Sequence, residues 1–182
     1  SKEKKVINYQ NCNNKKMTIN VFLNDHCKDA MNLTDFVENV CISLEDLNYT
    51  KENGYIDGIS SIFVKHLQDM PATERPIHCS DKKRLQFYVK DEDKWEKDKS
   101  HEKIDKSIQD ITIKQIKQIK QWEQKNPGYL QNEKLLSEWH SMVKQMMGGG
   151  EITECTRNFE QIKKSLSSTT EIKGVLLKDS EQ

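Results

Sequence analysis

Residues 76–90 constrain the fold more than any other stretch of this chain. The run 84–90, RLQFYVK, alternates polar and apolar residues, and this two-residue period is typical of a half-buried β-strand. Residues 76–79 are strand-like, and residues 80–83 have the composition of a turn. We therefore expect a β-hairpin. Its tip carries three cationic side chains, which we call the cationic tip: Lys82, Lys83 and Arg84.

Helical periodicity dominates the chain before this hairpin. Two short helices are expected between Thr34 and the turn at 52–54, the first capped by Thr34 and the second by the Ser43–Asp46 motif. A third helix is expected at 57–70, because Pro71 disfavours helical geometry in the residue before it. Residues 18–25, TINVFLND, are rich in β-branched and aromatic residues and predict a short strand.

Two long helical segments are expected after the hairpin. Regularly spaced isoleucines predict a helix from residue 100 to 125, and residues 131–147 predict a second helix after the Pro127-Gly128 break. Within the first helix, IKQIKQIKQW repeats every three residues. Because an α-helix has 3.6 residues per turn, this apolar stripe drifts around the helix and leaves Ile113 off the main seam.

These elements predict an α+β, mostly helical fold with a winged-helix-like core. The core consists of the short strand, the helices and the β-hairpin, and a helical C-terminal half follows it. The predicted parts are a flexible arm or linker at 1–17, the core at 18–98, a helical hairpin at 99–147, and a glycine linker, a short helix and a frayed tail at 148–182.

The composition limits the kinds of function that this chain can have. Its 182 residues suit one domain with an appendage or two small domains. Only 34% are apolar, against about 45–50% in a typical compact domain, so we expect part of the surface to be solvated or covered by a partner. Lysine and arginine balance aspartate and glutamate at 29 each, so nucleic-acid contact requires a local basic patch.

The remaining global features concern compartment and membrane. Five widely spaced cysteines with no Cys-x-x-Cys motif indicate reduced thiols. No apolar run approaches the length of a membrane span, so no membrane partner is expected. The chain opens with Ser1, and we expect it to be a processed fragment or a piece of a longer protein.

The order of strand, helices and hairpin is the order of a winged-helix module, in which one helix enters the major groove of DNA. The helix at 57–70 would take that place, and the cationic tip would meet phosphates. The residues expected to contact nucleic acid are Lys65, Lys82, Lys83, Arg84 and Lys90. The alternative is structural, since a basic turn is commonly only solvated, and Asp57 and Asp69 on the same helix would repel phosphate.

The apolar stripe of the helix at 100–125 predicts either an internal contact or a self-association surface, because such a stripe in a polar chain must be covered. Packing against the helix at 131–147 would cover it within one chain. In the other case two chains would share it. The expected interface residues are then Ile108, Ile111, Ile116, Ile119 and Trp122.

Three kinds of chemical site were weighed, and none reaches a catalytic signature. His26-Cys27 and His78-Cys79 offer four soft ligands, but adjacent residues of a strand point to opposite faces. Cys79 lies near a histidine and a lysine but lacks an oxyanion motif. Asp81, Asp91 and Asp93 could hold Mg²⁺ for a nuclease, although they also suit a solvated loop. We therefore expect no catalytic residue, no metal and no cofactor.

Three stretches of the chain resemble a known family. They are MTINVFLNDHCKDAMNLTDFVENV, GYIDGISSIFVKHL and ERPIHCSDKKRLQFYVKDEDKWEKD, and in this order they resemble an uncharacterised domain of giant DNA virus (mimivirus-like) proteins. The resemblance covers residues 17–147. In that family a Cys/His zinc-finger-like segment often precedes the domain, and this chain lacks it. The resemblance implies a viral protein of the host cytoplasm (viral factory) or virion, and it carries no catalytic residue.

The expected function is therefore a non-enzymatic binding and self-association module that organises or tethers nucleic acid or viral factory components. The expected partners are a second copy of the chain, DNA or RNA, and other viral proteins. The alternative is a winged-helix DNA-binding domain in viral transcription or replication. A metal-dependent nuclease is the third and least favoured hypothesis.

Overall fold

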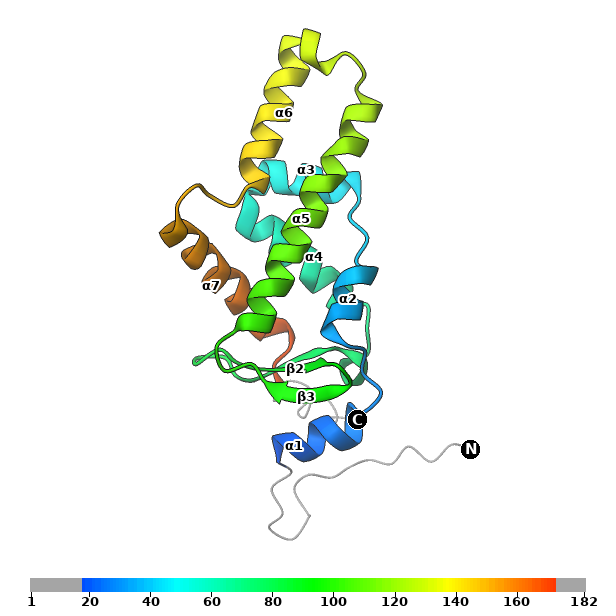
Figure 1. Ribbon diagram of the computed structural model, residues 1–182, viewed down its shortest axis with the longest axis vertical. Helices are drawn as coiled ribbons and strands as arrows, with labels where there is room; N and C mark the ends of the chain where they lie inside the picture. The colour runs from blue at the N-terminus through cyan, green and yellow to red at the C-terminus, as the bar shows by residue number, and fades with distance from the viewer. Residues whose placement is uncertain (1–17, 173–182) are drawn as a thin grey trace, which may run out of the picture.

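The computed structural model describes residues 18–172, which form seven α-helices, a three-stranded sheet and three short helical turns (Figure 1). The α+β, mostly helical class predicted from the sequence is confirmed. The helices are α1 (Ile19–Val21), α2 (Leu33–Asn39), α3 (Leu44–Asn53), α4 (Tyr55–Gln68), α5 (Glu102–Lys125), α6 (Glu133–Met146) and α7 (Ile152–Thr169). The short turns are η1 (Phe22–His26), η2 (Ala72–Glu74) and η3 (Tyr129–Gln131), and the strands are β1 (Ile77–Asp81), β2 (Gln86–Asp91) and β3 (Lys94–Lys97).

The predicted hairpin is confirmed as the antiparallel pair β1–β2, in which Ile77 faces Val89 and Cys79 faces Phe87. The sequence did not predict β3, which pairs antiparallel with β2 and completes the sheet in the order β1-β2-β3. The β2–β3 turn places both Glu92 and Asp93 at positive φ, the geometry of a two-residue hairpin loop. The pair lacks the usual Asn-Gly signature of such a loop.

The sheet separates two apolar clusters, because successive side chains of a strand point to opposite faces. On one face the side chains of Ile77, Cys79, Phe87 and Val89 belong to the larger cluster of buried residues, which we call the main core. The other face packs against a smaller group, which we call the outer cluster. Its members are Phe22, Leu23, Cys27, Ala30 and Ile172, with Ile19, Tyr88 and Trp95 packed against them.

The strand predicted at 18–25 is wrong, since this segment is helical and covers the outer face of the sheet. Thr18 caps it, with its hydroxyl oxygen accepting from the backbone N–H of Val21 at 3.3 Å. The adjacent residues Phe22 and Leu23 are both buried. A flat strand would turn one of these two neighbours away from the sheet, whereas a helix can present both.

The helix ends before the hairpin agree in part with the prediction. Ser43 and Asp46 form the expected capping box at the start of α3. The predicted Thr34 cap is wrong, because α2 begins at Leu33 and the Thr34 hydroxyl donates instead to Asp91 at 2.9 Å. Helix α4 starts at Tyr55, directly after Gly54.

Helix α4 lies at the centre of the bundle, packed against α3 on one side and α7 on another. Gly58 lets α3 and α4 approach closely, because a Cβ at this position would collide with Thr50. Arg75 joins the C-terminal ends of two helices, donating from Nε to Leu67 O of α4 at 2.7 Å and from a guanidinium nitrogen to Thr169 O of α7 at 3.2 Å.

Helix α7 ends at Thr169, and the chain directly after it is held against the sheet. The backbone N–H of Cys79 in β1 donates to Thr170 O at 2.9 Å, and Glu171 forms a parallel bridge with Cys79. Ile162 and Leu166 belong to the main core. Helix α7 therefore shares the main core with the rest of the described chain.

The three-residue repeat of α5 drifts around the helix as predicted. Ile113 is 48% exposed, Ile116 is half-buried and Ile119 is only 6% exposed. The glutamines drift in the opposite sense, so Gln115 is fully buried. Its Nε2 donates to Thr50 Oγ1 at 2.5 Å, while its Oε1 has no hydrogen-bond partner. The mismatch between the three-residue repeat and the 3.6 residues of a helical turn thus leaves Ile113 exposed and buries the side-chain amide of Gln115.

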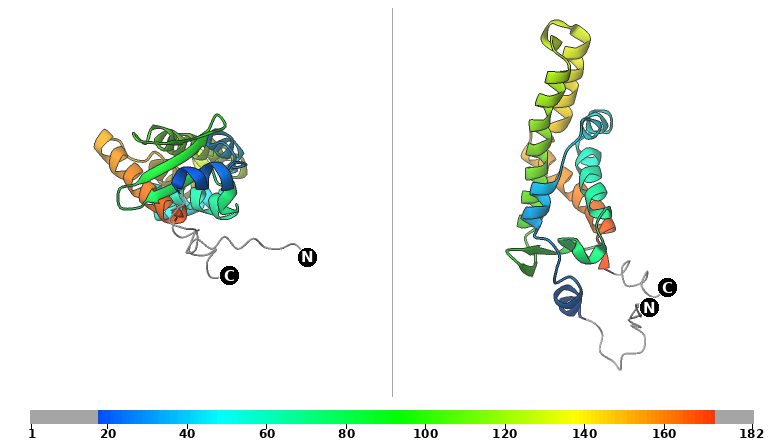
Figure 2. Two further views of the ribbon diagram at one scale, coloured as in Figure 1. Left: turned by 90° about the horizontal axis from the view of Figure 1, so that it is seen from below. Right: turned by 90° about the vertical axis from the view of Figure 1, so that its right-hand side faces the viewer.

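The distal half of α5 and the first half of α6 extend beyond the rest of the molecule as a two-helix arm (Figures 1 and 2). Aromatic rings close the arm near its tip, with Tyr129 against both Trp122 and Trp139. Glu123 Oε1 accepts from Trp139 Nε1 at 3.0 Å and from the Tyr129 hydroxyl at 3.3 Å. These contacts continue the main core into the arm and hold its two helices together.

We expect Gln115→Leu to raise the free energy of unfolding by about 1 kcal/mol, because it removes a buried carbonyl oxygen that has no partner. The hydroxyl of Thr50 keeps its bond to Asp46 O at 3.0 Å. Urea denaturation followed by circular dichroism measures the change. The matched control is Gln121→Leu on the exposed face of α5. A loss of more than about 1 kcal/mol for Gln115→Leu would contradict this account of the buried amide.

Candidate interaction surfaces

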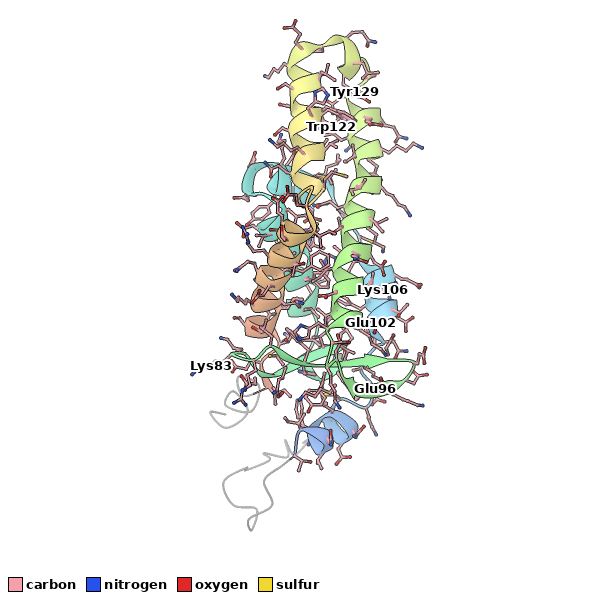
Figure 3. The ribbon with its side chains drawn as sticks, turned by 60° about the vertical axis from the view of Figure 1, so that its left-hand side comes forward. Lys83, Glu96, Glu102, Lys106, Trp122 and Tyr129 are labelled. Atoms are coloured by element: carbon pink, nitrogen blue, oxygen red, sulfur yellow. The ribbon has the colours of Figure 1, made fainter. Side chains whose placement is uncertain are left out.

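The cationic tip is exposed at the end of the β1–β2 hairpin, where Lys83 projects from the molecule (Figure 3). The carboxylate of Asp81 organises the turn by accepting from the backbone N–H groups of Lys83 and Arg84 at 2.9 and 3.0 Å. Ion pairing is loose, with Arg84 3.8 Å from Asp81 and Lys82 3.9 Å from Glu171. The three cations therefore remain available to an anionic partner.

The other two residues predicted to bind nucleic acid do not join this surface. Lys65 lies on α4 and pairs with Asp46 of α3 at 2.8 Å. Lys90 is buried beneath the outer cluster, and its Nζ donates to Lys28 O and Ala30 O, both at 2.7 Å. The prediction that Lys90 contacts phosphate is wrong, because the segment that covers the outer face of the sheet encloses this side chain.

Helix α4 lacks the free face that a major-groove helix needs. Helices α3 and α7 pack on it, and its exposed residues are Asp57, Lys65 and Gln68. Residues 25–74 also hold ten acidic side chains against three lysines, a net charge of −7. A phosphate backbone would be repelled by this part of the surface.

The predicted oligomer interface of α5 is covered within the chain. Ile108 and Ile111 are fully buried in the main core, Ile119 and Trp122 are buried as well, and Ile116 is half-buried. The prediction that these residues meet a second chain is therefore wrong for the four buried ones, and Ile116 is partly covered within the chain. Of the two alternatives for this stripe, packing within one chain is the one that the structure contains.

An open groove of about 600 Å³ lies between α5, α7 and the loop that joins α6 to α7, and we call it the α5–α7 groove. The described residues leave six large apolar side chains exposed, and three of them line this groove. These three are Ile113 at 48%, Met147 at 59% and Ile152 at 87% exposure. Phe159 and Cys155 also line it. The largest concentration of exposed apolar surface therefore lies here.

The groove has a well-defined wall. The Tyr55 hydroxyl donates to Thr112 Oγ1 at 2.8 Å, since the Thr112 hydroxyl itself donates to Ile108 O. Gly148, at φ +70°, lies so close to the Tyr55 ring that a Cβ would collide with it. Its carbonyl oxygen accepts from Asn158 Nδ2 at 2.8 Å. The triple glycine is thus a tight turn that α7 and Tyr55 hold in place.

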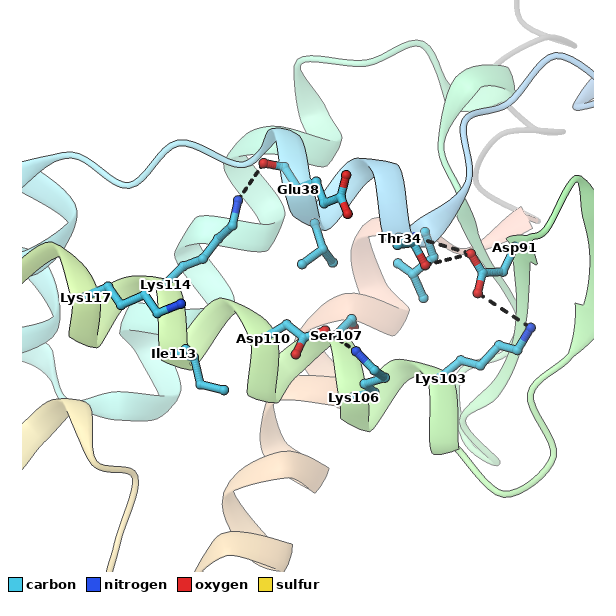
Figure 4. Close-up of a pocket in the computed structure, with 12 residues that line it drawn as sticks. Thr34, Glu38, Asp91, Lys103, Lys106, Ser107, Asp110, Ile113, Lys114 and Lys117 are labelled. Carbon is cyan, nitrogen blue, oxygen red and sulfur yellow. Dashed lines mark hydrogen bonds and ion pairs between the residues drawn. The ribbon is translucent and has the colours of Figure 1, made fainter.

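A second groove, of about 310 Å³, lies between α2 and α5 and is lined by four lysines (Figure 4). Most of these lysines are already engaged. Lys103 lies 3.8 Å from Asp91, Lys106 pairs with Asp110 at 2.6 Å, and Lys114 donates to Glu38 O at 2.6 Å at the end of α2. Because carboxylates and carbonyls occupy them, these lysines do not form an anion pocket.

The His-Cys pairs do not form the metal site that was weighed. One member of each pair meets beneath the sheet, with Cys27 Sγ 3.6 Å from His78 Nε2, while Cys79 points into the main core. Among residues 18–172, no group of three metal-ligating side chains comes together. Burial raises the pKa of both the Cys27 and Cys79 thiols to about 11, so neither is the low-pKa thiolate that nucleophilic catalysis requires.

The three aspartates considered for a nuclease site are also dispersed. Asp81 and Asp91 lie at opposite ends of the β1–β2 ladder, and five residues of extended strand span ~17 Å. Asp91 accepts from the Thr34 hydroxyl, and Asp93 accepts from Asn32 at 3.1 Å. The Asp91 and Asp93 carboxylates therefore form hydrogen bonds that link the sheet to the start of α2.

None of the helices in the described part of the chain is long and apolar enough to span a bilayer. No family model, curated protein or solved structure matches the chain. Two surfaces of the described residues have a distinct chemical character, the apolar α5–α7 groove and the cationic tip. The three-residue repeat of α5 predicts that Ile113 lies outside the apolar stripe. The exposure of Met147 and Ile152 depends instead on the direction that the chain takes after the three glycines.

We expect the protein to lose stability as the pH falls from about 6.5 to about 4. Burial, with help from the Arg75 charge, lowers the pKa of His78 to about 4, against about 6.5 in the unfolded chain. Between these values the unfolded state binds a proton that the folded state does not, so stability decreases by about 3 kcal/mol across the window. Urea denaturation as a function of pH measures this loss.

The control is His78→Gln, which keeps a polar side chain at this position but does not titrate. Its free energy of unfolding should change much less over the same pH range. If the variant and the original protein show the same pH slope, His78 is not the group responsible.

Proposed function

We propose that this chain is a non-enzymatic binding and self-association module, and that two copies meet through the α5–α7 groove. The observation that carries the proposal is the exposure of Ile113, Met147 and Ile152 around one groove. Exposed apolar side chains are unremarkable singly, but a contiguous group of them is typical of a protein-binding surface.

The charge around the groove favours a second copy as the occupant. Its charged lining residues are Asp105, Glu151 and Lys163, and the first and last of these pair at 2.9 Å. The lining thus carries a single net negative charge. Two such surfaces can face each other with little repulsion, whereas two copies of the acidic region 25–74 cannot.

The resemblance to a giant-virus domain extends this proposal to a setting. A self-associating module of that kind would organise or tether components of a viral factory in the host cytoplasm or in the virion. Other viral proteins would then be brought together through segments joined to this one.

We expect Ile113→Ser to weaken self-association at least about fivefold, because it removes exposed apolar area from the lining of the groove. Light scattering on the full 182-residue chain across a concentration series measures the effect. The matched control is Tyr49→Ser, since Tyr49 is also helical and is similarly exposed, at 43%, on α3. A chain that stays monomeric up to about 1 mM, a range where even weak dimers form, would reject the proposal.

The cationic tip supports a second candidate function, contact with DNA or RNA. This is the part of the winged-helix hypothesis that the exposure of Lys82, Lys83 and Arg84 favours. The contact would be made by the hairpin tip alone, because α4 is enclosed by its neighbours. Such a contact would be to phosphates and would carry little sequence preference.

We expect the triple change of Lys82, Lys83 and Arg84 to Ala to reduce the dependence of duplex DNA affinity on salt, by a slope of about 2–3 in log Kd against log salt concentration. Fluorescence anisotropy with duplex and single-stranded DNA measures it. The matched control removes three other exposed cations, Lys94, Lys97 and Lys99. An equal change of slope in both triple variants would show that the tip has no special role.

A further inference from the structure

We infer that two copies of the chain associate about a two-fold axis, each inserting Ile152 into the α5–α7 groove of the other. This inference rests on the proposed self-association and specifies its geometry. Ile152 is the first residue of α7 and is 87% exposed, so it projects from the surface. It also lines the groove, so a projecting apolar side chain and a recess lie side by side on one surface.

A surface that holds both a projection and a recess offers both halves of a contact with a second copy rotated by 180°. In a two-fold dimer each residue contact occurs twice, so both projections are covered and both recesses are filled. A head-to-tail contact would cover one of each and leave the others open to a further chain. The two-fold arrangement therefore covers the exposed apolar side chains of both grooves with the fewest copies.

The recess offers suitable chemistry for an isoleucine. Its apolar lining comes from α5, the end of α6 and α7, through Ile113, Met147 and Phe159. At the edge, Thr112 Oγ1 is already bonded to Tyr55 and Ile108, so covering it strands no hydroxyl. Of the charged side chains that line the groove, Asp105 and Lys163 are paired with each other at 2.9 Å.

The contact is small, so we expect a weak dimer, with a Kd of about 10–100 μM. Sedimentation velocity on the full 182-residue chain between about 10 μM and 1 mM covers this range. The expected result is a mass that rises to two chains and then stays constant. Ile152→Asp should raise the Kd at least about tenfold, since a carboxylate would enter an apolar recess.

Two further variants make the test specific. The folded state should tolerate Ile152→Asp, because an acidic residue is favourable in the first turn of a helix, and circular dichroism checks this. Ile152→Ser should weaken the dimer in the same direction without adding charge. Leu130→Asp is the matched control, because Leu130 is also a projecting apolar residue, 60% exposed, but lies on η3 at the tip of the arm.

The outcomes separate this inference from the proposed function. Self-association that Ile113→Ser weakens but Ile152→Asp does not would overturn the reciprocal insertion and leave the groove as the interface. A mass that continues to grow beyond two chains would replace the two-fold arrangement with an open one. A loss caused by Leu130→Asp would instead place the interface at the tip of the arm and overturn the reciprocal insertion. A monomer at every concentration would overturn both.

Discussion

A sheet with only three strands depends on having both of its faces covered, and this requirement shapes the whole molecule. The main core covers one face, and the segment 18–31 with Ile172 covers the other. Lys90 reaches through this second layer and holds it with two hydrogen bonds to backbone carbonyls. The same layer buries His78 and Cys27. Because this layer covers the outer face, Lys90, His78 and Cys27 have structural roles, although their residue types suggest a surface cation and metal ligands.

Local patterns predicted most elements of the fold, because the forces that produce them act within a few residues. The alternation at 84–90, the isoleucine spacing of α5 and the Ser43–Asp46 box each specify a local geometry. The segment 18–26 could not be predicted in this way. Its β-branched residues favour a strand when isolated, and its helical form results from burying Phe22 and Leu23 against a sheet that lies fifty and more residues further along the chain.

The candidate surfaces were predictable to different degrees for a related reason. The cationic tip follows from the hairpin alone, so its three residues are located correctly on the surface. The groove needs three elements that meet only after the chain has turned at Gly148–Gly150 and α7 has packed on α4. Ile113 was recognisable as an outlier on α5, but nothing near it in the sequence indicates that Met147 and Ile152 become its neighbours. Lys90 was misassigned because burial depends on distant parts of the chain, and for the same reason the sequence left two alternatives open for the α5 stripe.

The outer cluster joins the two ends of the described chain. Phe22 and Ile172 belong to the same group of buried side chains, on the side of the sheet away from the arm (Figure 1). The first and last described segments of the chain are thus in contact, and they stabilise each other through shared apolar contacts. Fraying at one end would expose the other, and the two should open as a single cooperative unit. Both ends of the described chain therefore lie at the pole opposite the arm (Figure 1).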